Sequence, residues 1–333
     1  MVPSFMGEIK APDSSRQIAF HQLLAAARKT WLREALSEAL SKVEPAVLRK
    51  ELSQYVPRNA AQILAAAGIR DEFVFPVPVV LKAMPTLVGY YRLLMGIPKK
   101  TFYASPSGMA LFQSMEISGI IRERQERALP DFCRAMAISL AELVVQISPA
   151  ITMQDVEELP LLTLGQQFQG SNNNRIGQEA TRDVFLAIVE ALGDAVESRT
   201  DKMAIVRNAS GRRVFITLAA DPDVRVEEEM TGEGRRKKLA LEIKGGTDRS
   251  NAHNRAGEAE KSHQKAKNEG FVDFWTLIAL HGLSTARLKE ESRTTTKWYD
   301  VAHVLARAGN DWDQFREDLA HAVGIPFTLD SSS

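Results

Sequence analysis

The chain is poor in cysteine, has no apolar run of membrane-spanning length, and carries no net excess of charge. A single cysteine, Cys133, excludes an intramolecular disulfide. Its amphipathic surroundings favour a buried small hydrophobe over a nucleophile. The N-terminus lacks the basic start and apolar run of a signal peptide. We therefore expect a cytoplasmic protein that makes no membrane contact.

The composition is that of a globular protein large enough for two domains. Apolar residues make up 44% and charged residues 25% of the 333 positions. Residues 1–170 are predicted to form a mainly helical region, and residues 171–333 a second domain. Glutamine, glycine and asparagine cluster at 166–174, which favours a flexible linker at this boundary.

The second region combines an amphipathic helix with several strands. Residues 173–192 keep apolar side chains at helical spacing. β-branched and aromatic runs between turn residues then predict antiparallel strands at 203–206, 214–218, 224–227 and 239–244. A polar helix follows, then a buried strand within 271–280. Two terminal helices are expected at 296–308 and 311–323.

Charged residues recur at the ends of two of these strands. Asp221-Pro222-Asp223 is followed, after eighteen residues, by Glu242-Ile243-Lys244. A hairpin centred on Glu233-Gly234 would set Asp223 opposite Lys244, with Glu242 at a diagonal position within reach. Alternation places Glu242 and Lys244 on one face of the sheet and Ile243 on the other. A single bulge would turn Asp223 away from them.

Two carboxylates and one ammonium at the edge of a sheet suit metal-assisted hydrolysis. Carboxylate oxygens match Mg²⁺, which commonly takes one or two of them together with substrate phosphate. Lys244 would position water or stabilise developing charge. The alternative is an ordinary cross-strand ion pair between Asp223 and Lys244. Asp221 shares the strand parity of Asp223, so either residue could be the metal ligand.

The segment after Lys244 is polar and locally basic. Ten basic and five acidic residues fall between Thr231 and Lys267. Such a surface beside a metal site favours contact with the phosphates of double-stranded DNA, although a solvated helix is the alternative. His253 and His263 lie on this helix, where we expect DNA contact or, more simply, solvent exposure. The candidate DNA-binding residues are Arg249, Asn251, Asn254, Arg255, Lys261 and Lys265.

The order of elements resembles a known family. Residues 173–282, with Pro222-Asp223 and Glu242-Ile243-Lys244, look like the PD-(D/E)xK nuclease fold of many type II restriction endonucleases. The chain length and the run from Lys244 to Lys267 resemble the XcyI-type restriction enzymes, which cut CCCGGG in duplex DNA. The resemblance implies a helix-rich α+β or α/β protein with a central mixed sheet.

The resemblance also implies roles for particular residues. It assigns Asp223, Glu242 and Lys244 as the catalytic set, with Asp223 and Glu242 as ligands of Mg²⁺. Glu179, on the preceding helix, is a fourth candidate, and a solvated or capping glutamate is its alternative. A palindromic site implies a homodimer that leaves 5′-phosphate ends. No organic cofactor is expected.

Two other functions fit the same residues. A repair or recombination nuclease of this fold would cut DNA without a fixed sequence. A non-catalytic DNA-binding protein would leave DNA intact in the presence of Mg²⁺. The helical region 1–170 would serve in DNA clamping, base recognition or dimerisation, and its sequence does not distinguish these roles.

Overall fold

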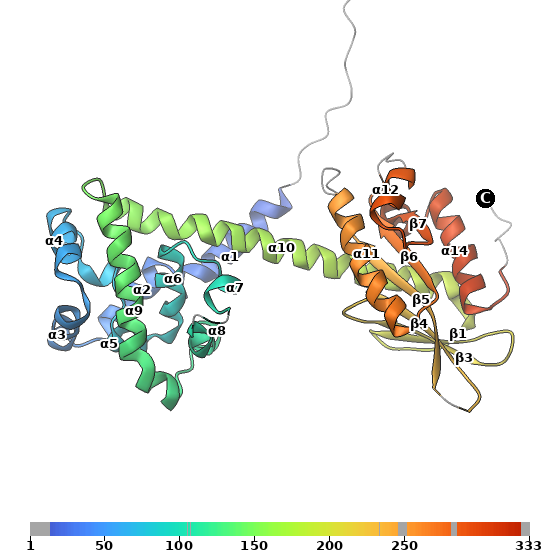
Figure 1. Ribbon diagram of the computed structural model, residues 1–333, viewed down its shortest axis with the longest axis horizontal. Coiled ribbons are helices and arrows are strands. Elements are labelled where there is room, and N and C mark those ends of the chain that lie inside the picture. Colours follow the sequence, from blue (N-terminus) through green and yellow to red (C-terminus); the bar gives the residue numbers. More distant parts are fainter. Residues whose placement is uncertain are drawn as a thin grey trace, which may run out of the picture. The chain divides into compact units, whose positions relative to one another are not determined.

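The computed structural model describes residues 14–104, 106, 108–232, 234–245, 252–280 and 285–327. The chain divides into two compact units, 1–172 and 173–333, and the division falls inside helix α10 (Met153–Leu192) (Figure 1). Within the described ranges, no helix is both long and apolar enough to cross a membrane.

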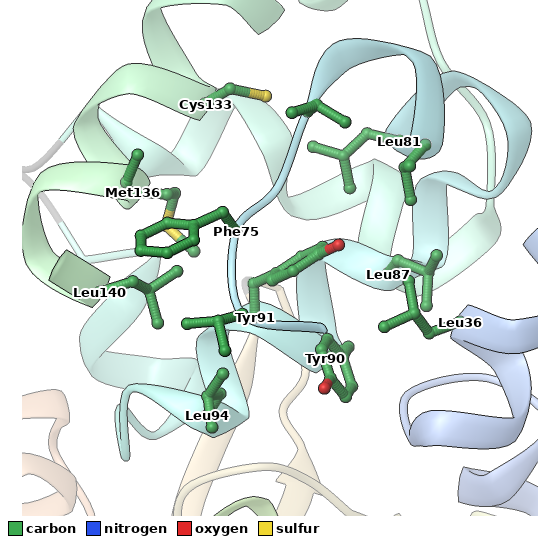
Figure 2. Packing of buried hydrophobic residues seen from close by; sticks show 14 of the residues in the cluster. Leu36, Phe75, Leu81, Leu87, Tyr90, Tyr91, Leu94, Cys133, Met136 and Leu140 are labelled. Carbon is green, nitrogen blue, oxygen red and sulfur yellow. The ribbon is translucent and has the colours of Figure 1, made fainter. Parts of the chain in front are cut away.

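The first unit is helical. Its helices before α10 are α1 (Ser15–Arg28), α2 (Arg33–Ser41), α3 (Pro45–Tyr55), α4 (Arg58–Ala66), α5 (Pro78–Ala83), α6 (Val88–Leu94), α7 (Lys99–Phe102), α8 (Gln113–Ser118) and α9 (Glu123–Ile147). Figure 2 shows its core, where Phe75 and Tyr91 pack near Met136 and Leu140 of α9. Cys133 is fully buried in this core, as its amphipathic surroundings predicted.

The second unit is built on one mixed sheet of seven strands in chain order. The strands are β1 (Val196–Arg199), β2 (Met203–Arg207), β3 (Arg213–Leu218), β4 (Val224–Glu229), β5 (Arg235–Lys244), β6 (Asp273–Ile278) and β7 (Lys297–Asp300). Strands β1 to β5 pair antiparallel, whereas β5, β6 and β7 pair parallel. The chain passes from β5 to β6 through α11 (Ala252–Glu269) and from β6 to β7 through α12 (Thr285–Glu291).

Helices cover both faces of this sheet. The larger core joins Val184 and Ile188 of α10 to one sheet face and to α13 (Val301–Ala306) and α14 (Asn310–Val323). On the other face, Ala240 and Phe274 pack with Ala266 of α11. The helix-rich fold with a central mixed sheet, predicted from the sequence, is confirmed.

Two local predictions are wrong. Residues 166–174 contain the division between the two units, but they are not a flexible linker, because α10 runs through them without interruption. No proline stops the helix there, and asparagine and glutamine are tolerated when helical segments flank them on both sides. The segment predicted as helix 296–308 begins as strand β7. Helix α13 starts only after Asp300, whose carboxylate accepts the Ala302 N–H at 2.9 Å as an N-cap.

Candidate active site

The β4–β5 hairpin does not have the predicted register. Val224 pairs with Leu241, so the ladder continues to Asp223 opposite Glu242 rather than Lys244. The turn is centred on Gly232 instead of Glu233-Gly234, with Met230 N–H donating to the Gly234 carbonyl at 3.3 Å. A β-bulge between Val226 and Glu227 then shifts the pairing once more. Beyond the bulge the net displacement is two residues, so Asp223, Glu242 and Lys244 keep their predicted faces.

Asp223, Glu242 and Lys244 therefore meet on the sheet face that α11 covers. The Ile243 N–H donates to Asp223 Oδ2 at 2.8 Å, which fixes this carboxylate against the end of β5. Lys244 Nζ lies 3.1 Å from Glu242 Oε2. The Ile243 side chain points the opposite way, into the core formed with α10 and α14.

Burial and mutual repulsion set the electrostatics of this cluster. Burial raises the pKa of Asp223, although the Ile243 N–H and the Lys244 ammonium oppose the shift. Burial and then the charge of Asp223 raise the pKa of Glu242 to about 7. Burial alone would lower the pKa of Lys244, but the Glu242 carboxylate raises it above its ordinary value.

Asp221 has a different partner. Its Oδ2 accepts from Lys265 Nζ of α11 at 2.7 Å, while Oδ1 is buried without a hydrogen bond. Burial opposes ionisation of Asp221, but the hydrogen bonds from Lys265 and Ser262 lower its pKa. Of the two acids that flank Pro222, Asp223 is therefore the one beside Glu242.

The donor set fits a hard divalent cation. Two neighbouring carboxyl groups face a single ammonium, so when both are ionised one negative charge is left for a cation to neutralise. In the part of the chain that the structure describes, no three acidic, histidine or cysteine side chains converge as a metal cage. Mg²⁺ does not require such a cage, because it keeps several waters and takes substrate phosphate as a ligand.

The other predicted site residues are scattered around this cluster. Glu179 is exposed on α10 and pairs with Arg175 at 2.7 Å. Of the DNA-binding candidates on α11, Asn254 and Lys261 are exposed, Arg255 is half-buried, and Lys265 pairs with Asp221. Arg249 and Asn251 lie outside the described residues.

The hairpin contributes less positive charge than its sequence suggests. Lys237 pairs with Glu269 at 3.2 Å, and Lys238 lies 3.6 Å from Glu228. Arg235 lies 3.5 Å from Glu227. The basic excess between Thr231 and Lys267 is therefore partly neutralised by acids of β4 and of the α11 C-terminus.

His263 was expected in solvent or on DNA, and that prediction is wrong. Its side chain is fully buried, with Nε2 2.9 Å from Thr276 Oγ1 of β6. Ala256, Ala259, His263 and Ala266 are all fully buried and follow one another at helical spacing. The three alanines at this spacing are the feature of the sequence that indicates a face of α11 packed on the sheet.

A comparison with known families gives this geometry its context. The family model described as XcyI restriction endonuclease matches residues 21–326. The chain belongs to the XcyI restriction endonuclease family. It is 37% identical to the type II restriction enzyme XcyI of Xanthomonas campestris pv. cyanopsidis, over 96% of this chain and 97% of that enzyme. It is 36% identical to the type II restriction enzyme Cfr9I of Citrobacter freundii, with the same coverage.

Membership in the XcyI family confirms the predicted enzyme class, a site-specific deoxyribonuclease. The match includes both units, so the helical first unit is part of the family pattern as well as the sheet. The alternatives of a repair nuclease and a non-catalytic binder receive no support from the family.

Proposed function

We propose that the chain hydrolyses phosphodiester bonds of double-stranded DNA at a fixed sequence, with Mg²⁺ held by Asp223 and Glu242. One observation carries this proposal: the half-buried Asp223 carboxylate and the buried Glu242 carboxylate meet next to Lys244, on the face of the sheet that α11 covers. A divalent cation would neutralise the two negative charges. The expected products are 5′-phosphate and 3′-hydroxyl ends.

The residues divide the work as follows. The Ile243 N–H fixes one oxygen of Asp223, which leaves the other available as a ligand. Glu242, held by Lys244, supplies a second ligand oxygen. When bound, Mg²⁺ supplies positive charge for the phosphate and makes water a stronger nucleophile. The Lys244 ammonium would orient that water or stabilise negative charge on the phosphate as the bond breaks.

We further propose that α11 lies along the DNA backbone. Lys261 is exposed, and Lys265 is exposed and next to the carboxylates, so both can reach phosphates near the scissile bond. The resemblance noted from the sequence suggests CCCGGG as the site, and a palindrome suggests a homodimer with each protomer cutting one strand. A cytoplasmic location and a fourth catalytic role for Glu179 stay predictions.

A plasmid cleavage assay tests the proposal. The full chain in millimolar Mg²⁺ should cut a plasmid with one CCCGGG site into a single linear product. It should not cut the same plasmid with that site altered, nor any plasmid when EDTA is present. Lys244→Ala and Glu242→Ala should each lose cleavage by at least about a hundred-fold and still bind the site, because the lost interactions act on the reacting phosphate.

Lys238→Ala is the matched control for Lys244→Ala. Lys238 lies on the same strand and pairs with Glu228 far from the carboxylates, so its removal should leave the rate unchanged. Wild-type cleavage by Lys244→Ala or Glu242→Ala would contradict the assignment of roles. Cleavage at many unrelated sequences would contradict the fixed site.

A further inference from the structure

The connection between β3 and β4, residues 219–223, ends at the proposed metal ligand Asp223. A backbone hydrogen bond closes this connection, from the Ala219 N–H to the Asp223 carbonyl at 2.9 Å. Pro222, directly before the ligand, has no N–H to donate. The backbone alone therefore holds Asp223 with few hydrogen bonds, and contacts from side chains outside the connection matter for its position.

Arg225 makes such a contact. Side chains alternate along β4, so Asp223 and Arg225 stand on one face of the sheet, and Val224 between them packs into the core with α10. The guanidinium of Arg225 reaches back along the chain, and its Nη2 donates to the Asp221 carbonyl. The backbone two residues before the ligand is thereby tied to the side chain two residues after it.

The end of α11 holds Arg225 from the other side. Arg225 Nη1 lies 3.4 Å from Oε2 of Glu269, the last residue of α11, and the guanidinium carbon lies 5.9 Å from the centre of the Phe271 ring. Phe271 is buried, and its N–H donates to the Ala266 carbonyl at 3.0 Å, which fixes the chain where α11 ends. The planar guanidinium carries several N–H donors, so it binds a carbonyl and a carboxylate at once.

Lys265 is a second cation on the same connection, but it is free to change partner. It donates to Asp221 Oδ2 at 2.7 Å, and it lies one turn before Glu269 on the same face of α11. The Lys265 side chain is 69% exposed, whereas that of Arg225 is 28% exposed. A DNA phosphate therefore competes with Asp221 for Lys265 more readily than it competes for Arg225. Arg225 is the contact that persists when DNA is bound.

Stability does not account for the arrangement around Arg225. The side chains of Arg225 and Glu269 are both partly exposed, and ion pairs of that kind add little to the free energy of unfolding. The Nε of Arg225 is buried and has no hydrogen-bond partner among the described residues, which opposes folding. What the contacts do provide is a fixed geometry on both sides of Asp223.

We propose that Arg225 is a positioning residue for Asp223, which it fixes by tying the Asp221 carbonyl to Glu269 at the end of α11. The inference rests on the proposed function, because it requires Asp223 to be a ligand of Mg²⁺. The Ile243 N–H already holds one oxygen of Asp223 at 2.8 Å, and a fixed backbone then presents the other oxygen in one orientation. Groups that orient a metal ligand typically contribute about ten- to a hundred-fold in metal affinity or activity.

Lys237→Ala is the matched control for Arg225→Ala. Lys237 Nζ lies 3.2 Å from the same Glu269 carboxylate and 5.3 Å from the centre of the same Phe271 ring. It stands on β5 opposite Glu227, further along the hairpin than Asp223. The two variants therefore lose the same kinds of contact with the end of α11, and only Arg225→Ala also loses the contact with the Asp221 carbonyl.

The first test compares these two variants in the full chain. It measures kcat and KM on a plasmid with one site, Mg²⁺ binding without DNA by calorimetry, and binding of the site in EDTA. Arg225→Ala should lower kcat and weaken Mg²⁺ binding, each about ten-fold, with KM and binding in EDTA unchanged. Lys237→Ala should match wild type in all four. Equal losses in the two variants would show a general weakening of the end of α11, and weaker binding in EDTA by Arg225→Ala alone would show a phosphate contact. Either result would overturn the proposal.

Arg225→Lys separates geometry from charge. The ammonium keeps the positive charge, but it lacks the planar fork that reaches the carbonyl and the carboxylate together. Its kcat and Mg²⁺ binding should therefore fall with those of Arg225→Ala. Wild-type values in Arg225→Lys would show that charge alone is sufficient and would overturn the proposal.

A double variant tests the link to α11. Glu269→Gln removes the charge that holds Arg225 and should lower kcat by itself. Combined with Arg225→Ala, the two losses should not multiply, because Glu269 has no guanidinium left to hold. Fully multiplicative losses would contradict the link through Glu269.

Asp223→Ala distinguishes failure of this inference from failure of the proposed function. If Asp223→Ala is inactive while Arg225→Ala has wild-type kcat and Mg²⁺ binding, the positioning role fails and the proposed function stands. If Asp223→Ala cuts DNA at the wild-type rate, the proposed function itself fails.

Discussion

Glu242 is a residue whose surroundings oppose its charge. It is 3% exposed, and its neighbour Asp223 carries a second carboxyl group. Its pKa in the folded chain is about 7, above the ordinary value of 4.5. Ionisation of this group therefore destabilises the folded state. The penalty is absent at low pH, grows as the pH rises from the ordinary pKa through the folded one, and is complete above it.

Glu242→Gln should therefore stabilise the protein at alkaline pH. The amide stays neutral at every pH, so the variant never buries this second negative charge beside Asp223. Without Mg²⁺, we expect the free energy of unfolding to rise by up to about 3 kcal/mol at pH 8 and to change little at pH 4. Urea denaturation at the two pH values measures this difference.

Mg²⁺ gives the same experiment an internal check. It should raise the melting temperature of the wild-type chain at pH 8, because it binds only the folded carboxylates. It should leave Glu242→Gln almost unchanged. A variant that is less stable than wild type at pH 8 would contradict the raised pKa on which the argument depends.

At the scale of single elements, the sequence predicted the faces of strands better than their registers. The alternation of Glu242, Ile243 and Lys244 was sufficient to place two charges on one face and an apolar side chain on the other. The register depended on which residue centres the turn and on a bulge beside Val226, and neither has a distinctive residue pattern. Strand β1 was missed because its residues are polar and mostly exposed.

The sequence also did not predict where the helices pack on the strands. The Pro-Asp and acid-x-Lys patterns identified Asp223, Glu242 and Lys244, but Thr276 carries no motif. It stands beside Glu242 only because β6 pairs with β5. The alanines at 256, 259 and 266 indicated a close approach, and His263 between them was misinterpreted because histidine is usually exposed on a polar helix.

Helix α10 packs closely against the residue that follows β5. A Cβ added at Gly245 would lie 2.3 Å from the Cβ of Ala180. In Gly245→Ala the new methyl group would overlap the Ala180 side chain. The variant should therefore force α10 and the end of β5 apart, next to Lys244. We expect a loss of about 1–3 kcal/mol in unfolding free energy and a lower kcat. Urea denaturation and the plasmid assay measure the two effects.

The partner position supplies the control for this prediction. Adding Ala180→Gly should remove the overlap and recover kcat, although glycine within a helix costs about 1 kcal/mol of stability. Gly257→Ala, on α11, has no atom within 4 Å of the new Cβ and should not destabilise the protein. Failure of Ala180→Gly to recover kcat would show that the contact does not set the position of Lys244.

At the scale of the whole molecule, each unit has its own hydrophobic core, and each core has its own buried polar group. In the first unit, Arg92 is fully buried and donates to both oxygens of Glu116 at 2.9 Å. Tyr103 O–H donates to the same carboxylate at 2.6 Å. Burial opposes the charge of Glu116, but the hydrogen bonds and charge of Arg92 lower its pKa below the ordinary value.

Glu116→Gln should therefore weaken the first unit selectively. It leaves the Arg92 guanidinium buried without a counter-charge, a change that typically costs about 3–5 kcal/mol. Hydrogen exchange followed by mass spectrometry should show faster exchange in peptides of α6, α8 and α9. Peptides of β5 and β6 should keep their protection, because the core of the second unit has lost no contact.

Glu123→Gln is the matched control, since the Glu123 and Arg127 side chains of this ion pair are both exposed and the pair is worth at most about 1 kcal/mol. Equal acceleration in both units would mean that they unfold as one cooperative body, and that the division inside α10 has no energetic counterpart.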